Sequence, residues 1–259
     1  MMLKEIQEIL KFKTLITTFA IIDLKIRYRN SILGIAWSFL EPLLILTILN
    51  LVFSTILLNN IEHFPIYLIL SLTMYNMFTR STSMSMESML SKAEIIKSVY
   101  VKREVFSISS NLTAILMMMI EFSIVIIFIM VFQFTPTITI LMLPIFFILL
   151  ACFSLGISLP LSALNIRFRD IRVIWTIITQ ALFFLTPIFY KIDFLPEPVA
   201  SIVRLNPLAL LIEMAHDSLL YDTLPSLQDM TYVTVSSLTM LFLGWMIFRK
   251  LNNRVDEII

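Results

Sequence analysis

Long apolar stretches separated by short polar segments run through most of the chain. Six of these stretches are close to 20 residues long, the length that an α-helix needs to cross the hydrocarbon of a membrane. Charged residues hardly interrupt them, so the pattern indicates an all-α membrane protein. The six transmembrane helices are predicted at about residues 39–58, 65–80, 105–132, 138–164, 173–190 and 231–248.

Residues 1–31 follow a different pattern. Apolar residues such as Leu3, Ile6 and Leu10 recur at near-helical spacing with charged residues between them. This pattern is typical of an amphipathic helix that lies along a membrane surface. Because the charges also interrupt any early apolar core, the segment is not a cleavable signal peptide, and we expect a cytoplasmic interfacial helix.

The connection between the fifth and sixth spans, residues 191–230, is long and itself apolar. Residues 199–205 and 208–220 have the composition of two short helices. Asn206 and Pro207 supply an N-cap followed by a proline at the first helical position. We therefore expect two re-entrant or interfacial half-helices at the outer mouth of the protein.

The composition supports a single membrane domain over residues 1–259. The chain is 59% apolar and 14% charged, whereas a typical soluble domain is about 45–50% apolar and about 25% charged. A net charge of +1 leaves no overall excess of Lys and Arg to bind phosphates. Membrane lipids are therefore expected partners, and nucleic acid is not.

The positions of the basic residues predict the orientation in the membrane. Cytoplasmic segments carry the excess of Lys and Arg. If both termini are cytoplasmic, all but two of the 19 basic residues lie inside, and the two exceptions are Lys191 and Arg204. We expect a multi-pass protein of the cytoplasmic membrane with both termini inside.

Two scarcities exclude several kinds of chemistry. With glycine only at Gly34, Gly156 and Gly244, the chain contains neither a GxxxxGK[ST] loop nor a GxGxxG turn, so any nucleotide must be bound by another subunit. The single Cys152 and the two distant histidines form no recognisable metal pattern. No nucleophile or acid and base pair is apparent, and neither enzymatic activity nor a cofactor on this chain is expected.

Glu121 lies near the centre of the third predicted span. An ionisable residue there costs roughly 2.5–3.5 kcal/mol, so it faces protein or a water-filled path. It is either a pathway residue, an anchor for a polar group on another helix, or a protonated glutamic acid with a structural role. Glu41, at the start of the first span, is better explained as a capping residue.

Other polar and aromatic residues are candidates for a substrate pathway. Gln180 and Phe183 share a face of the fifth span, which continues to Tyr190, and Asn50 lies on a polar stripe of the first span. Aromatic rings with amide groups suit a polyhydroxylated passenger. An aromatic belt at the outer interface is the better explanation for Tyr190, and the role of Phe183 stays open.

Two further patterns concern helix packing and the inner surface. Three serines of the fourth span, Ser154, Ser158 and Ser162, form a small-residue face that favours close helix packing. Residues 81–104 mix charged and apolar residues and favour a short amphipathic helix that docks on another protein. Asp170 follows a tight inner turn, where it can cap the fifth span.

Five stretches in this order resemble the membrane subunits of ABC exporters for cell-surface polysaccharides, the O-antigen, capsule and teichoic-acid permeases. The resemblance implies six spans per subunit, a homodimer that encloses the channel, and two ATP-binding subunits that carry ATP and Mg. The stretches are DLKIRYRNSILGIAWSFLEPLL at 23–44, AEIIKSVYVKREVF at 93–106, LNIRFRDIRVI at 164–174, TPIFY at 186–190 and RLNPLALLIE at 204–213.

The resemblance also assigns roles to inner and outer segments. Residues 93–106 match a coupling helix that inserts into the ATPase, and residues 199–220 match paired outer gate helices. Two departures stand out, because Val101-Lys102-Arg103 replaces the family's Phe-Pro-Arg and His216 replaces a common arginine. The coupling candidates are Glu94, Lys97, Tyr100, Lys102, Arg103, Glu104, Arg169 and Asp170, and the outer-gate candidates are Asn206, Pro207, Glu213 and His216.

The function implied is export of a lipid-linked polysaccharide across the cytoplasmic membrane, driven by ATP hydrolysis in the partner subunits. Two alternatives remain. One is a secondary transporter or channel that uses Glu121 as a proton or ion site. The other is an ABC exporter of a substrate without sugar, such as a drug or a lipid.

Overall fold

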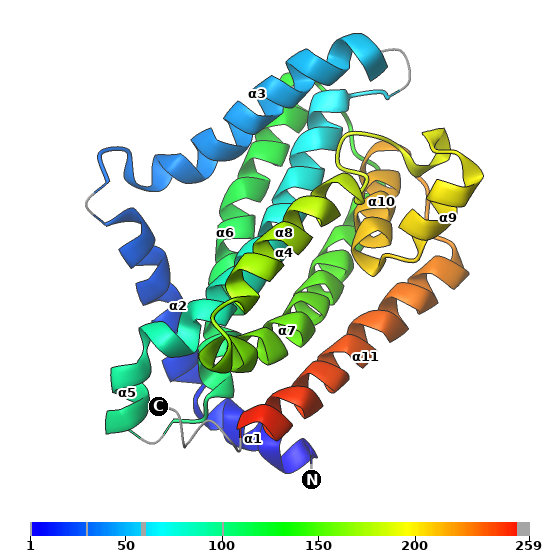
Figure 1. The fold of residues 1–259 in the computed structure, drawn as a ribbon. Helices are drawn as coiled ribbons and strands as arrows, with labels where there is room; N and C mark the ends of the chain where they lie inside the picture. Colours follow the sequence, from blue (N-terminus) through cyan, green and yellow to red (C-terminus); the bar gives the residue numbers. More distant parts are fainter. Residues whose placement is uncertain (1, 30, 58–60, 100, 253–259) are drawn as a thin grey trace.

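The structure is a computed structural model that describes residues 2–29, 31–57, 61–99 and 101–252. Within these ranges every regular element is a helix, which confirms the all-α prediction. Figure 1 shows a tilted bundle in which α1 and the end of α11 lie at the same end. The α-helices are α1 (Met2–Lys11), α2 (Lys13–Tyr28), α3 (Trp37–Leu57), α4 (Phe64–Ser91), α5 (Ala93–Ser98), α6 (Glu104–Val131), α7 (Leu143–Arg167), α8 (Ile171–Phe184), α9 (Glu197–Arg204), α10 (Pro207–Leu220) and α11 (Leu227–Asn252), and the 3-10 helices are η1 (Gly34–Ala36), η2 (Ile138–Met142) and η3 (Ile192–Phe194).

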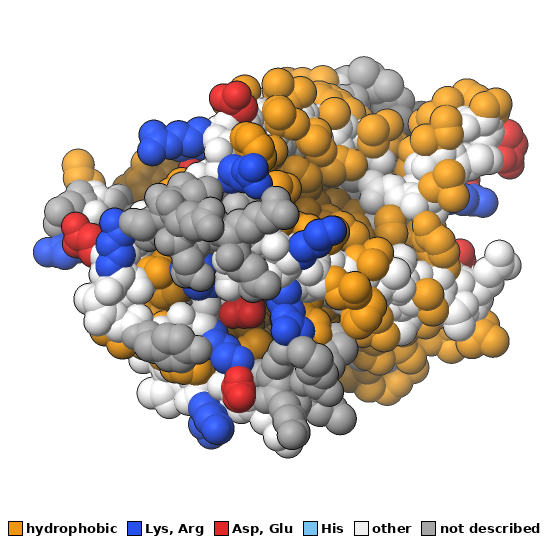
Figure 2. Space-filling model, turned by 60° about the horizontal axis from the view of Figure 1, so that its bottom comes forward, with side chains coloured by type: hydrophobic (Ala, Val, Ile, Leu, Met, Phe, Trp, Pro, Cys, Tyr) orange, Lys and Arg blue, Asp and Glu red, His pale blue; other side chains and the backbone are white. Residues whose placement is uncertain are grey.

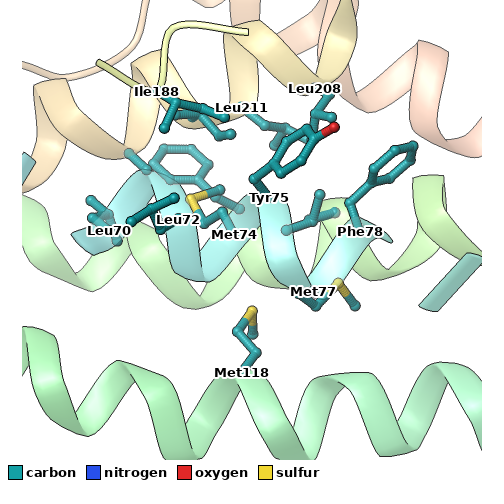
Figure 3. Packing of buried hydrophobic residues seen from close by; sticks show 14 of the residues in the cluster. Leu70, Leu72, Met74, Tyr75, Met77, Phe78, Met118, Ile188, Leu208 and Leu211 are labelled. Atoms are coloured by element: carbon teal, nitrogen blue, oxygen red, sulfur yellow. The ribbon is translucent and has the colours of Figure 1, made fainter. Parts of the chain in front are cut away.

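The core is built around α4, which packs against α6, α7, α8 and α10. Figure 3 shows α4 side chains between Met118 of α6 on one side and Leu208 and Leu211 of α10 on the other. Most α4 side chains in the half nearest its first residue are buried on all faces. A helix that is apolar and buried all round belongs at the centre of a bundle.

Small hydroxyl side chains bring α4, α6 and α7 close together, as the serine spacing predicts. Ser158 of α7 contacts Ser81 of α4, with their hydroxyl oxygens 3.3 Å apart. Ser107 of α6 donates to Ser162 of α7 over 2.9 Å. All four side chains are buried, and in lipid such small residues let helix backbones approach closely.

Gly156 and Gly244 allow the closest approach of α7 and α11. A Cβ atom added to Gly156 would lie 2.5 Å from the carbonyl carbon of Met240, and one added to Gly244 would overlap the carbonyl oxygen of Gly156. Any larger residue here would push backbone against backbone. The two glycines therefore fix how α11 crosses α7.

Within the residues that the structure describes, four helical stretches are long and apolar enough to cross a membrane. They are 34–52, 104–131, 138–167 and 227–252, and the apolar pair α9 and α10, bent by 97°, would be a fifth if counted as one span. The 97° bend confirms the prediction of two half-helices between α8 and α11. The apolar helix α8 has 14 residues, fewer than the roughly 17 that span hydrocarbon without thinning it.

Two predicted boundaries are wrong. The second span was expected to end at Arg80, but α4 continues to Ser91 because Ser85, Met86 and Met89 stay buried and no helix breaker intervenes. Only Ala93–Ser98 forms the separate short helix α5. The fifth span was extended to residue 190, whereas α8 ends at Phe184, since Pro187 disfavours helical geometry at the residue before it.

The first thirty residues form two helices instead of the single helix expected. They meet at Phe12, and α2 packs against α6 through Ile16, Phe19 and Ala20. Phe19 stacks on Phe106 with ring centroids 5.6 Å apart. The N-terminal segment is thereby attached to the start of α6.

We expect Gly244→Ala to destabilise the protein, because its added methyl group would meet backbone atoms of α7 and overpacking costs about 1–3 kcal/mol. Thermal unfolding of the purified protein in detergent should show a melting temperature lower by several degrees. Met246→Ala, at an exposed position two residues later, serves as the control and should leave the melting temperature unchanged. An unchanged melting temperature for both variants would contradict the close crossing.

Candidate functional site

Three charged side chains meet in the middle of the helix bundle. Arg80 of α4 donates from Nη1 to Oε1 of Glu121 on α6, and from Nη2 to Oε2 of Glu41 on α3 over 3.2 Å. Glu121 is fully buried, the Arg80 side chain is 10% exposed, and the Glu41 side chain is 52% exposed. One guanidinium thus joins three helices, and we call these residues the Arg80 cluster.

The Arg80 cluster gives Glu121 a polar partner on another helix. This contact is the one that the anchor role predicts for Glu121. Asn76 lies one turn before Arg80 on the same face of α4. The buried side-chain amide of Asn76 acts as a further donor towards the Glu121 carboxyl.

The prediction of a capping role for Glu41 is wrong. Glu41 lies within the first turns of α3, where its carboxylate pairs with Arg80. Sequence reasoning also placed Arg80 at the cytoplasmic end of a span and missed its role. One feature of the sequence could have revealed the role of Arg80. The helical pattern of small residues continues beyond Arg80 to Ser91, which places the arginine inside the helix.

A small cleft of about 230 Å³ brings two of the predicted pathway residues together. Gln180 and Phe183 of α8 line it with Tyr75 and Thr79 of α4. The edge of the Phe183 ring lies against Tyr75, with centroids 5.4 Å apart. The Tyr75 hydroxyl donates to the carbonyl of Thr179, which ties α8 to α4.

The three other pathway candidates, Glu121, Asn50 and Tyr190, do not line this cleft. Asn50 is half-buried on α3. Tyr190 lies beyond the end of α8, where its hydroxyl donates to the carbonyl of Phe184 over 2.9 Å. The Tyr190 carbonyl in turn accepts from Tyr67 over 2.6 Å, so this segment folds back on α4.

At the end of the bundle where α1 lies, ion pairs and hydrogen bonds connect the segment that follows α5 to α1 and to the end of α11. Lys102 pairs with Glu8 of α1, and this bond lowers the pKa of the Glu8 carboxyl. Arg103 donates to the side-chain oxygen and the carbonyl of Asn252, at the end of α11, over 2.9 and 3.2 Å. Figure 2 shows Lys and Arg side chains gathered on this face, with a few acidic ones among them.

The remaining coupling candidates are distributed over neighbouring surfaces. Glu94 and Lys97 are exposed on α5, and Arg169 and Asp170 are exposed in the turn before α8. Glu104 is the first residue of α6, and Tyr100 lies outside the described residues. Asp170 occupies the N-cap position of α8, but its side chain makes no capping hydrogen bond, contrary to the prediction.

The outer-gate candidates lie in and before α10. Asn206 caps this helix as predicted, since its side chain accepts from the backbone N–H of Leu208 over 3.1 Å, and Pro207 occupies the first turn. His216 is buried beneath Tyr67, with ring centroids 3.6 Å apart. Its Nε2 lies 2.7 Å from the Ser71 hydroxyl, and Glu213 is half-buried one turn earlier.

Among the described residues, no group of three His, Cys, Asp or Glu side chains could hold a metal ion. Helices long and apolar enough to cross a membrane, with buried polar contacts between them, define a multi-pass helical membrane protein. Comparisons with known proteins identify its family. Residues 14–220 match the family model described as ABC-2 type transporter.

The chain belongs to the ABC-2 type transporter family. It is 30% identical to an O-antigen export system permease protein RfbA of Klebsiella pneumoniae, with 92% of each chain covered. It is 23% identical to the protein of the same name in Myxococcus xanthus, with 99% of each chain covered. It is 21% identical to the capsule polysaccharide export inner-membrane protein CtrC of Neisseria meningitidis, over 89% of this chain and 88% of that protein.

We expect Arg80→Leu to destabilise the protein by about 3–5 kcal/mol, because it leaves the Glu121 carboxylate buried without its cation. The double variant Arg80→Leu/Glu121→Leu should recover most of that loss, as measured by thermal unfolding in detergent. The control is Arg172→Leu, which breaks an exposed ion pair with Glu87 and should change stability by less than about 1 kcal/mol. Strictly additive effects of the two leucine substitutions would contradict a direct ion pair.

Proposed function

We propose that the chain is the permease subunit of an ATP-driven exporter that moves a lipid-linked polysaccharide from the inner to the outer leaflet of the cytoplasmic membrane. The observation that carries this proposal is the similarity over nearly the whole chain to permeases named for O-antigen and capsule export. The channel is formed by two copies of the chain, and two ATP-binding subunits supply ATP and Mg. The substrate class follows from the names of these relatives.

In this proposal six helices cross the membrane: α3, α4, α6, α7, α8 and α11. Helix α4 is less apolar than the other five. Its 28 residues are about 42 Å long, which exceeds the roughly 30 Å thickness of the hydrocarbon. Its serine- and threonine-rich half is less apolar, but the hydroxyls bond within the bundle instead of facing lipid. The bent pair α9 and α10 enters from the outside and returns.

The same proposal places both termini in the cytoplasm. The ends of α4, α7 and α11 and the start of α6 then lie inside with most of the basic residues. Helices α1 and α2 lie along the inner surface, with α2 anchored on α6 through Phe19. Lys191 and Arg204 are left at the outer face.

A second copy of the chain completes the channel. Helix α3 exposes Leu44, Ile48 and Leu51, and α8 exposes Val173 and Ile177. Gln180 is exposed on the same helix as these apolar side chains. Because an amide facing hydrocarbon would lose its hydrogen bonds, this part of α8 faces a pathway for polar groups instead of lipid.

Coupling to ATP hydrolysis follows from the contacts at the inner end. Glu94 and Lys97 on α5 are exposed and available to a partner protein. Lys102 and Arg103, which follow α5, bind α1 and the end of α11. A displacement of α5 by the ATPase is thereby passed to α6, to α11 and to the N-terminal helices.

The Arg80 cluster bears on the alternative of an ion-coupled transporter. A proton or ion site needs a carboxylate that is free to exchange its ligand. Glu121 is fully buried and already bound to Arg80, which supports a structural role in this exporter.

The proposed function is tested by purifying the tagged chain in mild detergent from cells that also express its ATP-binding partner subunit. We expect a complex with equal numbers of the two chains, whose ATPase activity depends on this permease. Repeated purification of the permease without that subunit, or ion-driven flux in liposomes that contain this chain alone, would contradict the proposal.

We expect Arg103→Glu to reduce polysaccharide export about tenfold or more while the chain still inserts into the membrane. The substitution removes both hydrogen bonds to Asn252 and so disconnects the coupling segment from α11. Loss of one charge-assisted hydrogen bond costs about 1.5–3 kcal/mol, enough for a tenfold effect. Surface polysaccharide is measured at matched expression.

The matched control for Arg103→Glu is Lys250→Glu, which reverses an exposed charge near the same end of α11. Lys250→Glu should leave export unchanged. Equal export by the Arg103→Glu variant and the wild type would show that this link does not transmit the coupling motion.

A further inference from the structure

A further cavity in the described part of the chain lies apart from the Arg80 cluster, the cleft at α8 and the coupling segment. It is a groove of about 1050 Å³ between α7, α10 and α11. Figure 1 shows α11 running beside α7, with α9 and α10 next to its first turns. Its apolar lining includes Phe153, Leu210, Met240 and Leu243.

The shape and the rim of this groove suit a hydrocarbon chain. The α11 residues that line it, from Gln228 to Leu243, lie on one face of the helix over about 22 Å. One leaflet of a bilayer is about 15 Å of hydrocarbon, so the groove can hold a whole acyl chain. Its rim is open to the surroundings, because Leu205 is 68% exposed and Val235 is 62% exposed.

Two opposite charges lie at the end of the groove where α11 begins. Arg204, one of only two outer basic residues in the proposed orientation, donates to Asp193 over 2.9 Å and has further N–H groups to donate. Asp229 accepts from the hydroxyl of Ser226 over 2.6 Å with one carboxylate oxygen. Both Arg204 and Asp229 line the groove, so a cation and an anion stand above its apolar walls.

We propose that this groove binds a bilayer phospholipid with a zwitterionic, amine-bearing head group, of the phosphatidylethanolamine type. Arg204 binds the phosphate, Asp229 binds the ammonium, and one acyl chain fills the space between α10 and α11. An anionic head group fits this site less well, because it carries no cation that could pair with Asp229. A bound lipid would brace the bent pair α9 and α10 against the last span.

The inference does not depend on which substrate is exported, because it rests only on the position of the groove in a membrane protein. The experiment uses the full chain in nanodiscs made with phosphatidylethanolamine or with phosphatidylglycerol of the same acyl chains. Retained lipid is counted by native mass spectrometry. We expect at least fivefold more phosphatidylethanolamine than phosphatidylglycerol to remain bound.

Two variants locate the bound lipid. Thr239→Trp fills the groove and should abolish the retained phosphatidylethanolamine, whereas Leu238→Trp, at the adjacent exposed position that does not line the groove, should retain it. Asp229→Asn leaves the apolar walls and Arg204 intact and should remove the preference between the two lipids, because it removes the partner of the ammonium. Melting temperatures recorded for all three variants show that each is folded.

Three results would overturn the proposal. The first is equal retention of the two lipids by the wild type. The second is a folded Thr239→Trp variant that retains phosphatidylethanolamine like the wild type. The third is a disulfide-linked dimer of a Thr239→Cys/Cys152→Ser chain in membranes, which would show that a second copy covers the groove.

Discussion

Close contact between helix backbones holds this protein together, and small side chains make that contact possible. In a bilayer, burying apolar side chains between helices gains little over leaving them in lipid, so packing and hydrogen bonds between helices stabilise the bundle. Ser158 and Ser162 of α7 meet serines of α4 and α6, and Gly156 meets Gly244 of α11. The orientation of α4, α6, α7 and α11 follows from these few contacts.

The Arg80 cluster is the second determinant of the architecture, and it acts through charge instead of size. A buried arginine is tolerated because Glu121 neutralises it and Glu41 lies within reach. The bond from Arg80 to Glu41 also ties α3 to the central helices.

The two ends of the bundle are built differently. At the end where α1 lies, Lys102 and Arg103 connect the segment that follows α5 to α1 and α11 through charged contacts. Towards the other end, α10 is buried among α4, α7 and η2, and His216 stacks on Tyr67. Charged groups therefore hold the first end together, and buried packing holds the second.

The sequence by itself determined the all-helical membrane fold, the regions of most spans, the break at Asn206-Pro207 and the likeness to polysaccharide permeases. These features depend on local composition and spacing. Only the tertiary structure decided that α4 continues through Arg80, that Arg80 binds Glu121 and Glu41, and that Gln180 and Phe183 share a cleft with Tyr75. The physical reason is that each of these features depends on which side chains from distant parts of the chain meet in space. An unpaired charge is costly inside a membrane span, whereas a charge that has a buried partner is stable there.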